Sequence, residues 1–185
     1  MDKISSHSLH YPLFDIYWDY AKTIVGLTIG VGGLVYGLGN LISILFFGSV
    51  VAIFCFFGFQ SYKRHKSLVK VDKEGVRFKS WSQQEISWKS IKNIELRYFG
   101  RPAKEKDDNQ KPKGILHLVI KNDDQKITVD SSLYGFRYLV WCAILAVKEY
   151  KAPLDPGTVG NMLDIGLDPE GDSEMPDPLI PGFNL

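Results

Sequence analysis

A run of 40 residues without Asp, Glu, Lys, Arg or His, from Thr23 to Tyr62, constrains this chain more than any other feature. Charged residues make up 23% of the 185-residue sequence, so their absence over this stretch is not typical of a soluble globule. An α-helix rises about 1.5 Å per residue, and the hydrocarbon core of a bilayer is about 30 Å thick. The run is therefore long enough for two membrane crossings, and the sequence predicts a transmembrane hairpin.

The turn of this hairpin is expected at Gly37-Leu38-Gly39-Asn40, because Gly and Asn tolerate positive φ and end helices. This places the two spans at residues 21–38 and 41–62. Basic residues precede the first span and follow the second, whereas the turn between them carries no charge, so both termini are expected in the cytoplasm. The predicted localisation is that of a multi-pass protein, most simply in the bacterial cytoplasmic (inner) membrane.

The first predicted span is rich in glycine and poor in bulky side chains. Gly26, Gly30, Gly33 and Gly37 follow the spacing i, i+4, i+7 and i+11, which places them on one helical face. Small residues allow two helix backbones to approach closely in a membrane. These helix-packing glycines predict either that the hairpin packs on itself or that the face receives a transmembrane helix of a partner protein.

After the hairpin, short alternating runs separated by turn residues indicate a small antiparallel sheet of six strands. The strands are expected at 68–71, 76–81, 86–88, 91–99, 115–120 and 126–130. A helix capped by Ser131 or Ser132 should follow and run to about Lys151. Its apolar stripe contains Leu133, Phe136, Val140, Ile144 and Val147. A third membrane crossing is the alternative, but its apolar stretch of 10 residues is too short to span.

One segment of this region carries a resemblance to a known family. The residues Val71-Asp72-Lys73-Glu74-Gly75-Val76, followed by Ile86-Ser87-Trp88-Lys89-Ser90-Ile91-Lys92-Asn93-Ile94, resemble the bacterial pleckstrin-homology family. Members of that family often follow a two-helix membrane hairpin with such a segment. The layout alone is also similar to that of photosystem assembly proteins with two spans and a comparable domain.

The resemblance implies an α+β membrane protein in which two transmembrane helices precede an antiparallel β-barrel or sandwich, capped by a C-terminal helix. Four regions are predicted. They are a cytoplasmic N-terminal segment at 1–20, the hairpin at 21–62, a pleckstrin-homology-like domain at 63–152, and a Pro/Gly-rich tail at 153–185. Seven Asp and Glu residues and no Lys or Arg make this tail acidic.

Two further groups of residues are predicted to make contacts. Basic residues next to the membrane attract anionic lipid headgroups, and the expected lipid contacts are Lys63, Arg64, Lys66, Lys70 and Lys73. The tail ends in apolar residues separated by prolines, and Leu179, Ile180, Phe183 and Leu185 could dock as an extended peptide. The sequence does not decide whether the tail docks on its own chain or on a partner.

Nothing in the sequence indicates catalysis, and we expect no enzyme, cofactor or metal site. The two cysteines and four histidines lack metal-ligand spacing, and the basic residues lack the interleaved aromatic residues of nucleic-acid binding. The leading hypothesis is a non-enzymatic adaptor or assembly factor that contacts other integral membrane proteins on the cytoplasmic face. The alternatives are an anionic-lipid-binding or sensing protein and an immunity-type protein against a membrane-active toxin.

Overall fold

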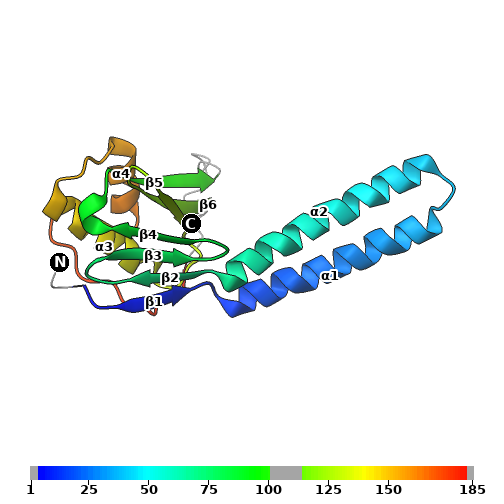
Figure 1. The fold of residues 1–185 in the computed structure, drawn as a ribbon, viewed down its shortest axis with the longest axis horizontal. Helices are drawn as coiled ribbons and strands as arrows, with labels where there is room; N and C mark the ends of the chain where they lie inside the picture. Colours follow the sequence, from blue (N-terminus) through cyan, green and yellow to red (C-terminus); the bar gives the residue numbers. More distant parts are fainter. Residues whose placement is uncertain (1–3, 101–113, 183–185) are drawn as a thin grey trace, which may run out of the picture. The chain divides into compact units, whose positions relative to one another are not determined.

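The computed structural model describes residues 4–100 and 114–182, and the chain divides into two compact units. The hairpin unit is Leu13–Ser67, and the folded unit combines Met1–Pro12 with Leu68–Leu185. The described residues form an α+β protein with four α-helices and two antiparallel sheets (Figure 1). The N-terminal segment thus belongs to the folded unit, although the sequence placed it in a region of its own.

The hairpin unit consists of α1 (Leu13–Tyr36) and α2 (Leu41–Lys66), which Figure 1 shows side by side. The turn forms where the sequence predicts it. Gly39 adopts φ +104°, and the Asn40 side chain accepts hydrogen bonds from the backbone N–H groups of Ile42 and Ser43, at 3.0 and 3.4 Å. Helix α1 begins eight residues before its predicted span and ends two residues short of it, whereas α2 extends four residues past its predicted end.

Of the helices in the described residues, only α2 is long and apolar enough to cross a membrane. None of its most apolar stretch is buried, and Ile42, Phe46 and Phe56 are more than 60% exposed. Asp15, Asp19 and Lys22 lie in the first ten residues of α1, so the uncharged part of this helix, residues 23–36, is only 14 residues long. The structure therefore supports one of the two predicted spans by length and composition.

The first sheet of the folded unit has the strand order β1-β2-β3-β4, with all neighbours antiparallel. Its strands are β1 (His7–His10), β2 (Leu68–Val71), β3 (Gly75–Lys79) and β4 (Gln83–Ser87). Alternate residues face the core, and Val69, Val76 and Ile86 have no exposed surface. Strand β1 was not predicted, and it pairs with β2 although the entire hairpin separates them in the sequence.

The second sheet has the order β5-β6-β7 and follows a short 3-10 helix, η1 (Trp88–Ser90). Its strands are β5 (Asn93–Gly100), β6 (Gly114–Lys121) and β7 (Lys126–Asp130). Their inward residues, among them Ile94, Leu118 and Ile127, are fully buried. In the described residues the two sheets do not close into a barrel, so the barrel form of the predicted fold is absent. A physical reason for the open barrel is that the outer edge of β5 contacts a helix instead of another strand.

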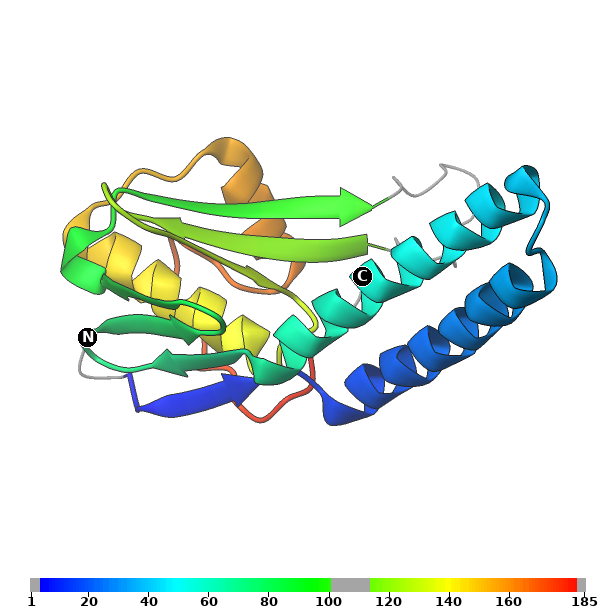
Figure 2. The ribbon, with the colours of Figure 1, turned by 45° about the vertical axis from the view of Figure 1, so that its right-hand side comes forward.

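Helix α3 (Phe136–Tyr150) supplies the centre of the core (Figure 2). The five residues of its predicted stripe, Leu133 to Val147, are all at most 8% exposed. The predicted serine cap is wrong, because the cap position is Gly135 at φ +69°. Ser131 instead accepts a hydrogen bond from the Leu116 backbone N–H at 3.1 Å, which ties the chain to β6. The burial of α3 also removes the alternative of a third crossing.

A further helix, α4 (Pro156–Asp164), lies within the predicted tail, and α3 is therefore not the last helix. Asp155 caps α4 through a hydrogen bond from the Thr158 backbone N–H at 3.0 Å, and Pro156 occupies the first turn, as is typical of helix starts. Met162 and Leu167 are at most 1% exposed. The tail thus joins the core of the folded unit and does not stand apart from it.

Candidate functional site

The glycine face of α1 is filled by side chains of α2. A Cβ atom added at Gly30 would lie 2.7 Å from Val51 Cγ2, and one at Gly26 or Gly33 would overlap the ring of Phe54 or Phe47. Gly58 of α2 in turn faces a side chain of α1, because a Cβ at this position would lie 2.7 Å from Thr23 Cγ2. Gly37 similarly faces Ser43. The four helix-packing glycines therefore lie against α2, and their face is not an open groove for another helix.

The last turn of α2 is basic, with Lys63, Arg64, His65 and Lys66 in sequence. Positive charge at a helix C-terminus is stabilised by the helix dipole. The Lys63 ammonium lies 4.5 Å from the centre of the Phe59 ring, and the Tyr20 hydroxyl lies 3.2 Å from His65 Nδ1. This end of the hairpin thus combines aromatic rings with cationic side chains, a combination typical of a membrane–water interface.

The remaining two predicted lipid contacts lie on the folded unit. Lys70 is exposed on β2 and pairs with Arg77 on β3, whereas Lys73 lies in the turn that follows β2. Lys70 and Lys73 therefore belong to a different unit from Lys63, Arg64 and Lys66, although all five lie within eleven residues of sequence.

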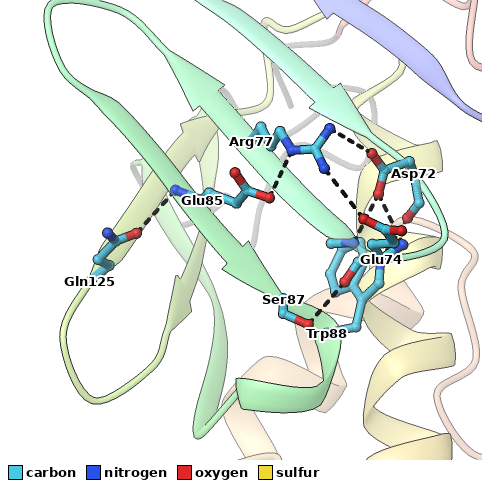
Figure 3. Close-up of polar contacts among 8 residues, drawn as sticks. Asp72, Glu74, Arg77, Glu85, Ser87, Trp88 and Gln125 are labelled. Atoms are coloured by element: carbon cyan, nitrogen blue, oxygen red, sulfur yellow. Dashed lines mark hydrogen bonds and ion pairs between the residues drawn. The ribbon is translucent and has the colours of Figure 1, made fainter.

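Arg77 is enclosed by acidic side chains (Figure 3). Its guanidinium forms ion pairs with Asp72, Glu74 and Glu85, at 3.1, 3.5 and 2.8 Å. The hydrogen bond to Glu85, with the neighbouring negative charges, raises the pKa of Arg77 above its ordinary value. A phosphate group would have to compete with three carboxylates, so this strand pair is unsuited to binding phosphoinositide headgroups.

Polar groups around Asp72 fix the turn between β2 and β3 (Figure 3). The Asp72 carboxylate accepts hydrogen bonds from the backbone N–H groups of Glu74 and Gly75. The backbone carbonyl of Asp72 accepts a further hydrogen bond from the Trp88 indole at 2.8 Å. Gln125 accepts a hydrogen bond from the Glu85 backbone N–H at 3.0 Å, which joins the two sheets. Asp72, Glu74, Gly75 and Trp88, which belong to the segments that carry the family resemblance, therefore have structural roles.

Helix α4 covers the edge of β5 with side-chain hydrogen bonds. The Thr158 hydroxyl accepts a hydrogen bond from the Leu96 backbone N–H at 3.0 Å, and Asn161 Nδ2 donates to the Leu96 carbonyl. The hydroxyl of Thr158 donates in turn to Asp155, which lowers the pKa of that carboxyl group. The two side chains satisfy backbone groups that would otherwise be open to another strand.

The rest of the tail runs over α3 and is held mainly by its backbone. The Trp141 indole donates to the Ser173 carbonyl at 3.1 Å, Lys148 donates to the Gly171 carbonyl, and the Gly135 N–H donates to the Ile180 carbonyl at 2.9 Å. Leu179 is 76% exposed and Ile180 is 46% exposed. Phe183 and Leu185 lie outside the described residues. The tail therefore docks on its own chain while it presents Leu179 and Ile180 outward.

Two open pockets, each lined by both charged and apolar residues, border the tail. One, of about 590 Å³, lies between α3 and the tail and is lined by Arg137, Asp168, Asp172 and Glu174. The other, of about 640 Å³, lies between β5 and α4 and is lined by Glu95, Arg97 and Asp155. Glu95 pairs with Lys121 at 2.7 Å and with Arg97, and these contacts lower its pKa. In the described residues, no group of three His, Cys, Asp or Glu side chains could hold a metal ion.

Two exposed residues near the start of β2 were not among the predicted contacts. Lys79 pairs with Leu68, and Trp81 follows in the turn between β3 and β4, where it is 68% exposed. Both lie at the end of the sheet where β2 begins. Only the strand register gives this placement, because Lys79 follows Leu68 by eleven positions in the sequence.

No known family, curated protein or solved structure matches the chain.

Proposed function

We propose that the protein is a non-enzymatic adaptor or assembly factor anchored in the membrane by both helices of the hairpin unit. The observation that carries this proposal is the pairing of His10 with Leu68 in one sheet, across the hairpin. Because β1 precedes α1 and β2 follows α2, both ends of the hairpin must emerge on the same side of a bilayer. If α2 crosses the bilayer, α1 must return the chain across it.

The exposure of α2 supports the membrane as its surroundings. A core helix of a soluble protein buries its apolar side chains, whereas Ile53 and Phe56 are each 64% exposed. Glycines of α1 pack against Phe47 and Phe54, which suits two neighbouring helices in lipid. The basic end of α2 supports a cytoplasmic location for the folded unit and for both termini. In a bacterium this corresponds to the inner membrane.

The sheet arrangement supports the resemblance to the pleckstrin-homology family. A four-stranded and a three-stranded antiparallel sheet precede the buried helix α3 in the chain. In this assignment the hairpin is an insertion between β1 and β2, and not a separate region before the domain. The fold itself does not specify a function, so the adaptor role depends on the exposed surfaces of the folded unit.

The tail is the surface that we assign to partner contacts. Its backbone is hydrogen-bonded to α3, so the exposed side chains of Leu179 and Ile180 are held on a fixed support. A preformed apolar surface costs less conformational entropy on binding than a free peptide does. We therefore expect other integral membrane proteins to contact these residues on the cytoplasmic face.

Two measurements test the proposal. The full chain should stay in the membrane pellet after alkaline carbonate washing, because both helices are embedded in lipid. A photo-crosslinking residue at Leu179 should then capture integral membrane proteins in native membranes, whereas the same residue at Asp124, in the exposed turn between β6 and β7, should not. Extraction of the chain by carbonate, or equal capture from both positions, would contradict the proposal.

Anionic lipid binding is a second candidate, favoured by the three cationic residues Lys63, Arg64 and Lys66 at the end of α2. Each basic side chain near an anionic surface contributes about 1 kcal/mol. Replacing all three by Gln should reduce the enrichment of anionic lipid around the chain in mixed nanodiscs, whereas Arg77→Gln should not, because Arg77 is already neutralised. Equal lipid enrichment in both variants would exclude this role.

A further inference from the structure

The end of the first sheet that joins the hairpin is defined by the strand register. His10 pairs with Leu68, Leu68 pairs with Lys79, and Lys79 pairs with Gln83. These residues form a row across all four strands at one end of the sheet. The opposite end carries the turn from Asp72 to Glu74. The chain enters and leaves the hairpin at the first of these ends.

The connections between the sheet and the hairpin are short. Only Tyr11 and Pro12 separate β1 from α1, and only Ser67 separates α2 from β2. Tyr11 is buried, and the Ser67 hydroxyl donates to the Lys63 carbonyl at 2.7 Å. If the hairpin spans the bilayer, as proposed above, this end of the sheet is held close to the membrane surface.

The turn between β3 and β4 extends beyond this row. Ser80 and Ser82 close the turn through a backbone hydrogen bond of 3.3 Å. Trp81 is two residues past Lys79, so it reaches at most about 7 Å beyond the row at about 3.3 Å per residue. Trp81 is 68% exposed, and Lys79 beside it is also exposed. A large exposed indole next to a lysine is typical of residues at the membrane–water interface.

The charge next to the exposed indole is positive. Lys79 precedes the turn, and the turn Ser80-Trp81-Ser82 itself carries no acidic residue. The opposite turn carries Asp72, Lys73 and Glu74, and its two carboxylates pair with Arg77. A lysine beside the indole favours contact with an anionic lipid surface. From this local charge, the short connections and the exposed indole, we propose that the turn Ser80-Trp81-Ser82 inserts Trp81 into the headgroup layer of the membrane that holds the hairpin. The turn would be a second contact with lipid besides the hairpin, and it would fix the orientation of the folded unit on the membrane.

Fluorescence quenching by brominated lipids tests this inference on the full chain. The protein is reconstituted with phosphatidylcholine and phosphatidylglycerol, with or without bromine near the headgroup end of the acyl chains. Trp18→Phe removes the exposed indole of α1, and Trp88 and Trp141 are at most 4% exposed. The difference between Trp18→Phe and the double variant Trp18→Phe, Trp81→Phe then reports on Trp81.

We expect the single variant to lose emission in brominated vesicles and the double variant to lose much less. A matched control adds Lys73→Trp to the double variant, which places an indole at the opposite end of the sheet, where it should not be quenched. Equal quenching of the single and double variants, or quenching at position 73 as strong as at position 81, would overturn the inference.

Vesicle flotation separates this inference from the proposed function. If all variants float after alkaline washing and Trp81 is not quenched, the hairpin anchor stands and the contact of the turn with lipid is wrong. If the natural chain does not float, the anchor and the contact both fail. An unchanged emission maximum of Trp88 and Trp141 in the double variant shows that its folded unit is intact.

Discussion

The Thr158 hydroxyl accepts a hydrogen bond from the Leu96 backbone N–H at 3.0 Å, and this contact joins the tail to the edge of the second sheet. The bond is buried, and Thr158 itself is 2% exposed. An acidic, proline-rich tail thus completes the folded unit by covering a strand edge. A sheet edge left open could pair with other chains.

Replacing Thr158 by Val should lower the free energy of unfolding by about 1–3 kcal/mol, because the shape is kept while a buried N–H loses its acceptor. Thr158→Ser keeps the hydroxyl and should cost less. Chemical unfolding of the detergent-solubilised full chain, followed by near-UV circular dichroism, measures both. Equal stability of the two variants would show that the hydroxyl does not support the edge of β5.

Gly30→Leu should destabilise the hairpin, because a Cβ at this position lies 2.7 Å from Val51 Cγ2 and 3.3 Å from the Val51 backbone nitrogen. The matched control is Gly32→Leu, since nothing lies within 4 Å of a Cβ at Gly32. We expect a lower melting temperature in detergent for Gly30→Leu and little change for Gly32→Leu. The same loss in both variants would indicate a general effect of leucine and not of helix packing.

Replacing residues 13–66 by a short Gly-Ser loop should give a soluble folded unit. His10 and Leu68 are paired, and paired residues on adjacent strands lie about 5 Å apart, so a short loop can close the gap. Gel filtration and near-UV circular dichroism should show a folded monomer. A chain of residues 63–152 lacks β1 and α4 and should aggregate. If this shorter chain folded equally well, the N-terminal strand and the tail would not be part of the core.

Cys142 should make the folded unit sensitive to alkaline pH. Burial raises the pKa of its thiol from about 9 to about 12, so the native state keeps a proton that the unfolded chain loses above pH 9. Stability is therefore fully present below pH 9 and falls as the pH rises toward 12, by about 1 kcal/mol per pH unit near pH 10.

The variant Cys142→Ala lacks this group, and its free energy of unfolding should fall less steeply over the same pH range. The comparison uses the slope of the free energy of unfolding against pH, because removal of a buried thiol also changes packing and so changes the free energy itself. Burial also raises the pKa of Tyr138 to about 12, and its interaction with Cys142 adds to this rise, so the loss of Cys142 should reduce the contribution of Tyr138 to the slope in the same direction. Parallel pH curves would show that the thiol does not ionise differently in the two states.

Local patterns in the sequence were sufficient for most of the individual elements. Alternating apolar residues predicted β2 and β7 with the bounds that the structure has, and Gly39 and Asn40 marked the turn of the hairpin. The apolar stripe of α3 also identified residues that the structure buries. Such features depend on neighbours within a few positions, because alternation, helical periodicity and turn formation are local properties.

Strand pairing and tail docking could not be predicted in this way. The first residues, His7–His10, contain only one core position, Leu9, and nothing nearby indicates a partner beyond the hairpin. The tail has the composition of a segment without a core of its own, yet Met162 and Leu167 are buried. Both segments gain order from surfaces formed by distant residues.

The candidate contact residues show the same distinction between local sequence patterns and tertiary structure. The sequence alone determined that a neutral stretch ends in a cluster of Lys and Arg, which is a property of consecutive residues. Only the tertiary structure decided that Lys73 and Trp81 lie at opposite ends of the first sheet, because their positions depend on which strands pair and in which register. Pairing register is set by the packing of side chains from the whole folded unit, and no single segment contains that information.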